Sequence, residues 1–274
     1  MSIVDAIILG LVQGLTEFLP ISSSGHLVIA QYLLGLPTQD VAFDVALHVG
    51  TLFSIFTIYF SLLKKVLVKG LLSRDLFKLK NLESRLIFMV LVASVPTAFI
   101  GLVFRHQLEA MFSDMKSLGI CFILTGVILY LTRFMKSDTT WTKDSLKSLT
   151  GVEKITSVKA FLIGTAQGLA IIPSISRSGT TIITGLYLGL PGPTVAMFSF
   201  IMSLPAIAGA ALLELKDIPL TSARWEIIAI GVFTSYLSGL LGLLTVLKVI
   251  RKGRLELFTG YLILLGVWVL WKMA

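Results

Sequence analysis

Long apolar stretches separated by short polar segments are the dominant pattern of this chain. About 20 apolar residues are enough to cross the hydrocarbon core of a bilayer as a helix. Two of the stretches, residues 86–104 and 227–247, contain no charged residue at all. The pattern predicts an all-α integral membrane protein with six transmembrane helices. They are expected at residues of about 42–63, 86–104, 116–133, 195–213, 227–247 and 255–271.

Two further apolar regions, residues 3–36 and 160–190, are interrupted by proline and by polar residues. Each half of such a region is too short to cross a bilayer. Non-helical backbone at membrane depth is tolerated only where it is buried in protein or lines a cavity. We therefore expect both regions to form re-entrant helical hairpins.

The two interruptions repeat each other at a constant offset. The first reads Gln13-Gly14-Leu15 and then Ile21-Ser22-Ser23-Ser24-Gly25-His26. The second reads Gln167-Gly168-Leu169 and then Ile175-Ser176-Arg177-Ser178-Gly179-Thr180. Because each half holds one hairpin and an odd number of spans, the second half is inverted relative to the first. Broken helices at matching positions of an inverted repeat indicate a binding site near the midplane. The predicted units are a first repeat at 1–135, a cytoplasmic linker at 136–159 and a second repeat at 160–274.

Basic residues predict the orientation, since loops rich in Lys and Arg stay in the cytoplasm. Loops 63–85, 133–160 and 248–254 are rich in them, whereas loops 105–116 and 214–226 are poor. This places both termini on the extracytoplasmic side of the cell (plasma) membrane. The rich loops contain Lys64, Lys65, Lys69, Arg74, Lys78, Lys80, Arg85, Arg133, Lys136, Lys143, Lys147, Lys154, Lys159, Lys248, Arg251, Lys252 and Arg254. The poor loops contain Arg105, Lys116, Lys216 and Arg224.

The composition agrees with a membrane protein. Of 274 residues, 55% are hydrophobic and 14% charged, and the mean hydropathy is +0.92. A soluble domain carries roughly a quarter charged residues. The net charge of +8 would suggest a nucleic-acid partner in a soluble chain, but here the cytoplasmic loops account for it. The single cysteine, Cys121, excludes an intrachain disulfide.

The first interruption carries a carboxylate, a histidine and three hydroxyls within a short distance. Gln13 and Glu17 are four residues apart and share a helical face, and Pro20 then ends that helix. The serines that follow can cap the next helix, and His26 lies at its start. A polar kink in a packed helix is the alternative, but it does not need so many polar groups. The candidate residues are Gln13, Glu17, Ser22, Ser23, Ser24, Gly25 and His26.

The second interruption has the features of an anion site. A helix that restarts near Ser178 points free N–H groups and a positive dipole end into the site. Arg177 adds a planar cation suited to phosphate oxygens, and Gly179 allows close backbone approach. The alternative is that Arg177 only neutralises Glu17. Both motifs together favour a phosphorylated lipid as the ligand. The candidate residues here are Ser174, Ser176, Arg177, Ser178, Gly179 and Thr180.

At these residues the chain resembles the undecaprenyl-diphosphate phosphatase (bacitracin-resistance) family over its whole length. The matching motifs run from Gln13 through Glu17 and Pro20 to His26, and from Pro173 to Thr181. Two positions depart from the family pattern. Gln13 replaces a glutamate, which weakens any divalent metal site, and Ser174 replaces a glycine.

The resemblance implies hydrolysis of undecaprenyl diphosphate to undecaprenyl phosphate and inorganic phosphate, which recycles the lipid carrier for cell-wall polysaccharide synthesis and confers bacitracin resistance. It also implies an extracytoplasmic site, a divalent cation (Mg or Ca) with Glu17 as a metal ligand, and a homodimer. A polyprenyl diphosphate lipid is the expected partner, and no nucleic acid is expected.

The proposed catalytic set is Glu17, Ser23, His26 and Arg177. Ser23 is either the nucleophile or a phosphate ligand for a direct attack by water. His26 takes the proton of Ser23 or protonates the leaving oxygen, and Glu17 orients His26, activates water or holds the metal. Asp44 and His48, one helical turn apart, either line the cavity or form a buried pair. The rival function is a flippase that carries a polyprenyl phosphate across the membrane.

Overall fold

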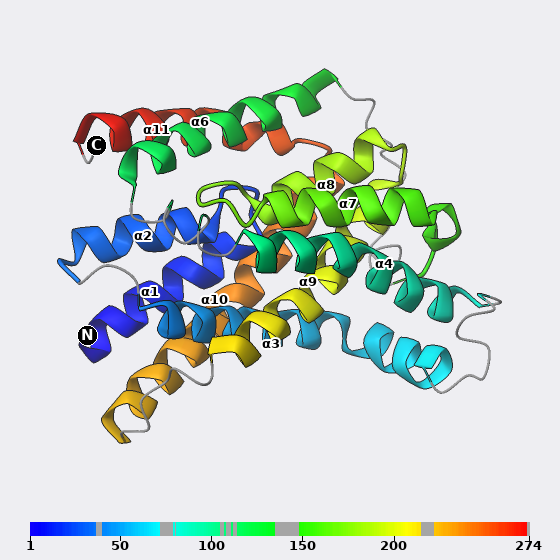
Figure 1. Cartoon of the computed structure of the whole chain (residues 1–274), viewed down its shortest axis with the longest axis horizontal. Coiled ribbons are helices and arrows are strands. Elements are labelled where there is room, and N and C mark those ends of the chain that lie inside the picture. Colours follow the sequence, from blue (N-terminus) through cyan, green and yellow to red (C-terminus); the bar gives the residue numbers. More distant parts are fainter. Residues whose placement is uncertain are drawn as a thin grey trace.

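The computed structural model describes residues 1–36, 40–71, 79, 81–104, 107, 111, 114–134, 148–214 and 222–272. These residues are almost all helical (Figure 1). The main helices are α1 (Ile3–Glu17), α2 (Ser23–Leu33), α3 (Val41–Val66), α4 (Leu82–Val103), α6 (Met115–Leu131), α7 (Ser157–Leu169), α8 (Arg177–Tyr187), α9 (Gly192–Glu214), α10 (Ser222–Arg251) and α11 (Thr259–Lys272). Short helical turns cover Leu67–Leu71, Thr132–Phe134, Val152–Lys154 and Leu255–Phe258.

The six predicted spans are confirmed among the described residues. Six helical segments are long and apolar enough to cross a membrane. The first extends beyond residue 63, where the prediction ended it, because a helix continues past the apolar core wherever its polar side chains find partners. Lys65, for example, pairs with Glu83 at 3.2 Å. The segments are Val41–Gly70, Leu82–Val103, Met115–Phe134, Gly192–Leu213, Arg224–Arg251 and Leu255–Lys272.

The two interrupted regions each form a pair of short helices. The helices α1, α2, α7 and α8 have 15, 11, 13 and 11 residues. At a rise of about 1.5 Å per residue, none of them reaches the roughly 30 Å needed to cross the hydrocarbon core. Side chains at the breaks start the second helix of each pair. Ser22 caps α2 by accepting from Gly25 N, and Ser176 caps α8 by accepting from Gly179 N.

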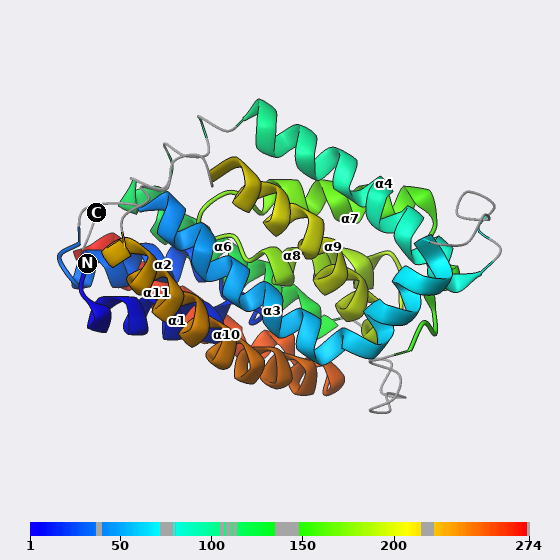
Figure 2. The same ribbon diagram turned by 90° about the horizontal axis from the view of Figure 1, so that it is seen from below.

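The two helix pairs occupy matching places in the bundle. Helix α1 packs along α10 and α7 along α4, while α3 packs on α10 and α4 on α9. Helices α6 and α11, the last spans of the two halves, lie side by side along one edge (Figure 1). The pair α1–α2 lies toward the end that holds both termini, and α7–α8 lies toward the opposite end (Figures 1 and 2).

Glycines at matching positions allow the close approach of these helices. A Cβ on Gly10 of α1 would meet Gly231 O of α10 at 2.8 Å. A Cβ on Gly164 of α7 would overlap Ala93 O of α4. Small residues at helix interfaces are typical of membrane bundles, since they let backbones pack directly on each other.

Replacing Gly164 with alanine is therefore expected to destabilise the bundle. Overpacking of this kind costs about 1–3 kcal/mol, so the melting temperature in detergent should fall. Gly209→Ala is the matched control, because a Cβ there meets nothing within 4 Å. Alanine is also the better helix former, by about 1 kcal/mol, so this control should melt at or above the parent temperature. Equal melting of both variants would contradict the close-packing argument.

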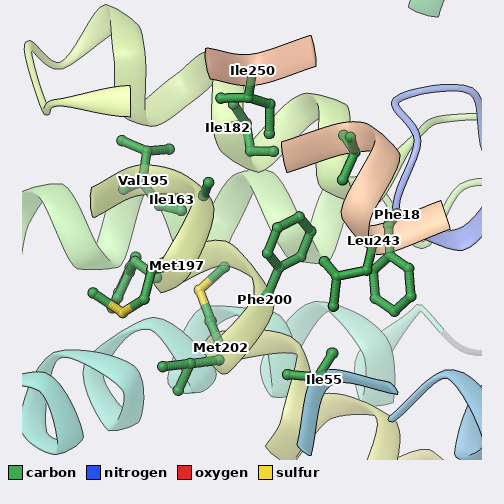
Figure 3. Packing of buried hydrophobic residues seen from close by; sticks show 14 of the residues in the cluster. Phe18, Ile55, Ile163, Ile182, Val195, Met197, Phe200, Met202, Leu243 and Ile250 are labelled. Carbon is green, nitrogen blue, oxygen red and sulfur yellow. The ribbon is translucent and has the colours of Figure 1, made fainter. Parts of the chain in front are cut away.

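The apolar core packs against the residue that follows α1. Phe18, just after α1, meets Phe200 of α9 edge to face with ring centroids 5.6 Å apart. Ile55 of α3 and Leu243 of α10 belong to the same cluster (Figure 3). This core therefore fixes the end of α1, and with it the position of Glu17, relative to the second half.

The predicted linker and the basic loops are only partly described. Residues 136–147 of the linker lie outside the described residues. The rest of the linker is folded: Val152 and Ile155 are buried, and Arg85 of α4 donates to both of their carbonyl oxygens. The following residues of the charge argument lie outside the described residues: Arg74, Lys78, Lys80, Arg105, Lys136, Lys143, Lys147 and Lys216.

Candidate active site

The two sequence motifs meet at the breaks of the two helix pairs. Arg177, the first residue of α8, forms an ion pair with Glu17, the last residue of α1. Next to this pair, Ser176 Oγ and Ser178 Oγ donate to Leu19 O at 3.4 and 3.2 Å. The two polar interruptions, far apart in sequence, therefore form one polar centre.

The carboxylate of Glu17 is the hub of this centre. Its Oε2 accepts from Ser23 Oγ at 2.5 Å and from Gln13 Nε2 at 2.9 Å. His48 Nε2 lies 3.5 Å from the same oxygen, and Arg177 binds Oε1. The Glu17 side chain is only 5% exposed. A buried carboxylate is costly unless it is paired and hydrogen-bonded, so the ion pair with Arg177 and the bonds from Ser23 and Gln13 stabilise the ionised form of Glu17.

The guanidinium of Arg177 keeps capacity for a ligand. An arginine has five N–H donors in a planar fork, and Glu17 is bound through one nitrogen, Nη2. The Arg177 side chain is 23% exposed, more than its carboxylate partner. Its remaining donors can therefore bind phosphate oxygens while the ion pair stays intact.

Several candidate residues stabilise the two helix breaks through hydrogen bonds and close packing. Ser22 Oγ caps α2 and lies 3.2 Å from Ser24 Oγ. Thr180 donates its backbone N–H to Ser176 O at 2.8 Å. At Gly179, a Cβ would meet Pro20 Cβ at 3.1 Å, so this glycine lets the two motifs pack closely. Ser24 and Thr180 are half-buried, whereas Ser23 is buried against Glu17.

Ser174 adopts a backbone conformation that favours glycine. Its φ is +62°, and its buried Oγ has no hydrogen-bond partner. A Cβ on Gly25 would overlap that oxygen and would meet Phe122 Cζ at 2.5 Å. The left-handed backbone explains why a glycine suits this position, because a side chain there is strained.

Replacing Ser174 with glycine is expected to stabilise the protein by about 1 kcal/mol. The change removes left-handed strain of about 1–2 kcal/mol and an unpaired buried hydroxyl worth about 1–3 kcal/mol, and these gains exceed the added chain entropy of glycine. Thermal unfolding in detergent measures the effect. Ser157→Gly, at an exposed helical position of α7, is the control and should melt lower than the parent. A lower melting temperature for Ser174→Gly would contradict the strain argument.

His26 makes its contacts outside the Glu17 cluster. Its Nδ1 lies 2.6 Å from Ser22 O, and its Nε2 lies 2.6 Å from the hydroxyl of Tyr261 on α11. The interpretation that Glu17 orients His26 therefore does not match the hydrogen bonds in the structure. Ser23 instead donates to Glu17. The reason is geometric: the turn after α1 folds Ser23 back onto the end of α1.

Sequence reasoning left two contacting residues out of the catalytic set. The sequence left open whether Asp44 and His48 line the cavity or pair with each other. The two side chains have different partners: His48 lies next to Glu17, whereas the Asp44 side chain accepts from Gln31 Nε2 at 2.7 Å. A polar residue inside an apolar span was the signal for His48. Tyr261 gave no signal, because an aromatic residue in an apolar helix is ordinary. A small cavity beside the ion pair is lined by Glu17, Phe18, Arg177, Ser178, Ser199, Phe200 and Ser203.

Two oxygen-bearing side chains of this centre could serve a divalent cation. Glu17 brings one carboxylate, whose oxygens already accept from Arg177, Ser23 and Gln13. Gln13 Oε1 is a buried oxygen without a hydrogen-bond partner. Glu17 and Gln13 would hold a cation that takes its other ligands from water and the phosphates of a substrate, as Mg²⁺ commonly does. Within the described part of the chain, no group of three His, Cys, Asp or Glu side chains could hold a metal.

The fold and the site define a multi-pass membrane protein with a polar centre between two pairs of short helices, in which an arginine pairs with a buried carboxylate. The family model of bacitracin resistance protein BacA matches residues 6–268. The chain therefore belongs to the BacA family.

Curated relatives agree over nearly the whole length. A protein of Desulforapulum autotrophicum named undecaprenyl-diphosphatase is 39% identical, with 97% of both chains covered. Relatives of the same name from Carboxydothermus hydrogenoformans and Halothermothrix orenii are 42% and 37% identical. Those alignments cover 97% and 98% of this chain and 95% and 98% of the relatives.

Proposed function

We propose that this protein is a phosphatase that hydrolyses undecaprenyl diphosphate to undecaprenyl phosphate and inorganic phosphate. The observation that carries the proposal is the contact of Arg177 and Ser23 with one buried carboxylate, Glu17. This arrangement combines an anion-binding cation with a hydroxyl next to a base, which a phosphoryl transfer needs. The family membership supports the lipid substrate. The product is a carrier lipid that cell-wall polysaccharide synthesis reuses, and its recycling would confer bacitracin resistance.

The terminal phosphate is proposed to bind at the start of α8, against the guanidinium of Arg177. The free N–H groups and the positive dipole end of a helix N-terminus favour an anion. The planar guanidinium offsets the charge that develops on the transferred phosphoryl group. The prenyl chain of the lipid stays in the bilayer.

Ser23 is proposed as the nucleophile and Glu17 as its base. The oxygen of Ser23 attacks the terminal phosphorus, its proton passes to Glu17, and the bond from that phosphorus to the bridging oxygen breaks. Undecaprenyl phosphate leaves with the bridging oxygen. Water then attacks the phosphoserine: its proton passes to a base, Glu17 returns the first proton to the Ser23 oxygen, and inorganic phosphate is released. The hydrogen bond of 2.5 Å between Ser23 and Glu17 supports this order of roles.

His26 is proposed to take a proton at Nε2 from the water that hydrolyses the phosphoserine. It lies three residues after Ser23 on α2, so both side chains share one helical face. Its Nε2 is bound by Tyr261 in the structure, and the water has to replace that contact.

The two helix pairs are proposed to be re-entrant and related by an inverted repeat. Three observations support this proposal: the short helices, the matching packing of α1 on α10 and α7 on α4, and the opposite ends toward which the pairs lie (Figures 1 and 2). Both termini lie at the same end of the molecule (Figures 1 and 2), which supports placing them together on the extracytoplasmic side.

Phosphate release in detergent micelles tests the function. Micelles have no sidedness, so a flippase for polyprenyl phosphate would release no phosphate from undecaprenyl diphosphate, whereas a phosphatase would. The matched control is protein with Arg177 replaced by alanine. Absence of phosphate release by the unmodified protein would refute the proposal. A chelator arm of the same assay tests whether a divalent cation carried on the diphosphate contributes.

A further inference from the structure

The ring of His26 is held on several sides by residues from both halves of the chain. Besides the bonds at Nδ1 and Nε2, the ring stacks on Tyr261 with centroids 5.7 Å apart and planes 15° apart. Phe122 of α6 meets it edge to face at 5.3 Å. The ring is therefore fixed both in its plane and in its direction.

The partner of Nδ1 selects one tautomer of the His26 ring. The carbonyl oxygen of Ser22 can only accept a hydrogen bond, so Nδ1 of His26 carries a proton. In the neutral ring, Nε2 then has a lone pair, which accepts from the hydroxyl of Tyr261. When Nε2 is protonated, the same phenolic oxygen can accept instead. The contact between the two side chains thus holds in both states of the ring.

We propose that Tyr261 is a positioning residue: its hydroxyl holds Nε2 of His26 and fixes the orientation of the ring, so that Nε2 is the nitrogen that exchanges a proton in the reaction. The inference rests on the proposed function. His26 and Tyr261 are 235 residues apart in sequence, so the last helix of the chain supports the first motif. Hydrogen bonds to the two ring nitrogens of a histidine commonly set which nitrogen reacts.

The exposure of Tyr261 fits this role. Tyr261 is 47% exposed, whereas Ser22, whose backbone carbonyl holds Nδ1 of His26, is buried. The bond at Nε2 is therefore the one that the attacking water can replace without moving the backbone. The bond at Nδ1 then keeps the ring in place during the exchange.

The variant Tyr261→Phe tests the proposal, because it keeps the stacked ring and removes only the hydroxyl. We expect kcat to fall about tenfold and KM to change less than twofold. The matched control is Tyr236→Phe. It removes a tyrosine hydroxyl of α10 that lies 3.2 Å from Oγ1 of Thr57 on α3. This control should keep both constants within about twofold.

The same change is tested on the background of His26→Ala. If Tyr261 acts only through His26, removing its hydroxyl there has no further effect on kcat. A tenfold loss on both backgrounds would overturn the proposal, and so would an unchanged kcat for Tyr261→Phe in the presence of His26.

Nitrogen NMR of histidine-labelled protein gives a reading that does not depend on turnover. The unmodified protein should show the neutral Nδ1–H form of His26, assigned by its loss in His26→Ala. Tyr261→Phe should keep Nδ1 protonated but shift the Nε2 resonance, because that nitrogen loses its hydrogen bond. An unchanged nitrogen spectrum in Tyr261→Phe would overturn the proposal, while failure of the unmodified protein to release phosphate would refute the proposed function instead.

Discussion

Replacement of Arg177 with alanine is expected to lower kcat/KM for undecaprenyl diphosphate by about 10³-fold or more. An arginine that stabilises the charge of a transferred phosphoryl group contributes about 10³–10⁵ in rate. The loss also leaves Glu17 buried without its cation, which costs about 3–5 kcal/mol of stability. Phosphate release has to be measured together with the melting temperature, so that unfolding and loss of chemistry are separated.

Arg177→Lys separates the two effects. It keeps a cation beside Glu17, so the protein should stay folded, but it loses the planar fork that binds phosphate at two points. We expect its activity to fall at least about 100-fold with little change in melting temperature. Arg224→Lys is the matched control, since Arg224 pairs with Asp40 through two hydrogen bonds outside the site. Activity near the parent level in a folded Arg177→Ala or Arg177→Lys variant would contradict the assignment.

Replacement of Ser23 with alanine is expected to lower kcat by about 10³-fold, with KM changed less than about threefold. The hydroxyl is proposed to attack phosphorus, so its loss removes a group that acts in the transition state and contributes little to ground-state binding. Steady-state phosphate release measures both constants. The buried carboxylate keeps its bonds to Gln13 and Arg177, so the fold should persist.

Ser24→Ala is the control for this change. Ser24 Oγ lies near Ser22 Oγ rather than Glu17, and we expect its loss to cost less than about fivefold in kcat. Rapid quenching with substrate labelled at the terminal phosphate should trap label on Ser23 in the unmodified protein. A Ser23→Ala variant within tenfold of the parent, with no trapped label, would favour direct attack by water.

Much of the fold follows from local pattern. The six spans could be predicted because each is a continuous apolar run, and burial of such a run in a bilayer depends little on its neighbours. The breaks near Pro20 and Pro173 could be predicted because each proline, which lacks the backbone N–H, stands beside a run of serines and glycines that favours a turn and a new helix start. Proline alone does not decide a break, since Pro96 and Pro205 lie inside α4 and α9. The extents of the spans were less accurate. The π-helical turn Leu67–Leu71 prolongs α3, and pairing of Lys65 with Glu83 helps to hold this end.

The candidate site was predictable as a set of residues but not as a set of bonds. Glu17 and Arg177 stood out because charged groups inside apolar sequence are costly, and the structure brings them into contact. Of the α2 residues in the first motif, Ser23 and not His26 bonds to Glu17. The direction of the turn between α1 and α2 decides which of these side chains folds back onto α1. No periodicity in the sequence contains that direction.

The sequence by itself determined that this is a six-span membrane protein with two matching broken segments that carry an acid, an arginine, a histidine and several hydroxyls. Spans and breaks are set by the chemistry of neighbouring residues, so they can be read along the chain. Only the tertiary structure decided which of these groups touch, that His48 joins Glu17, and that Tyr261 from the last helix holds His26. Those contacts depend on how helices from the two halves pack against each other, and that packing is a property of the whole bundle.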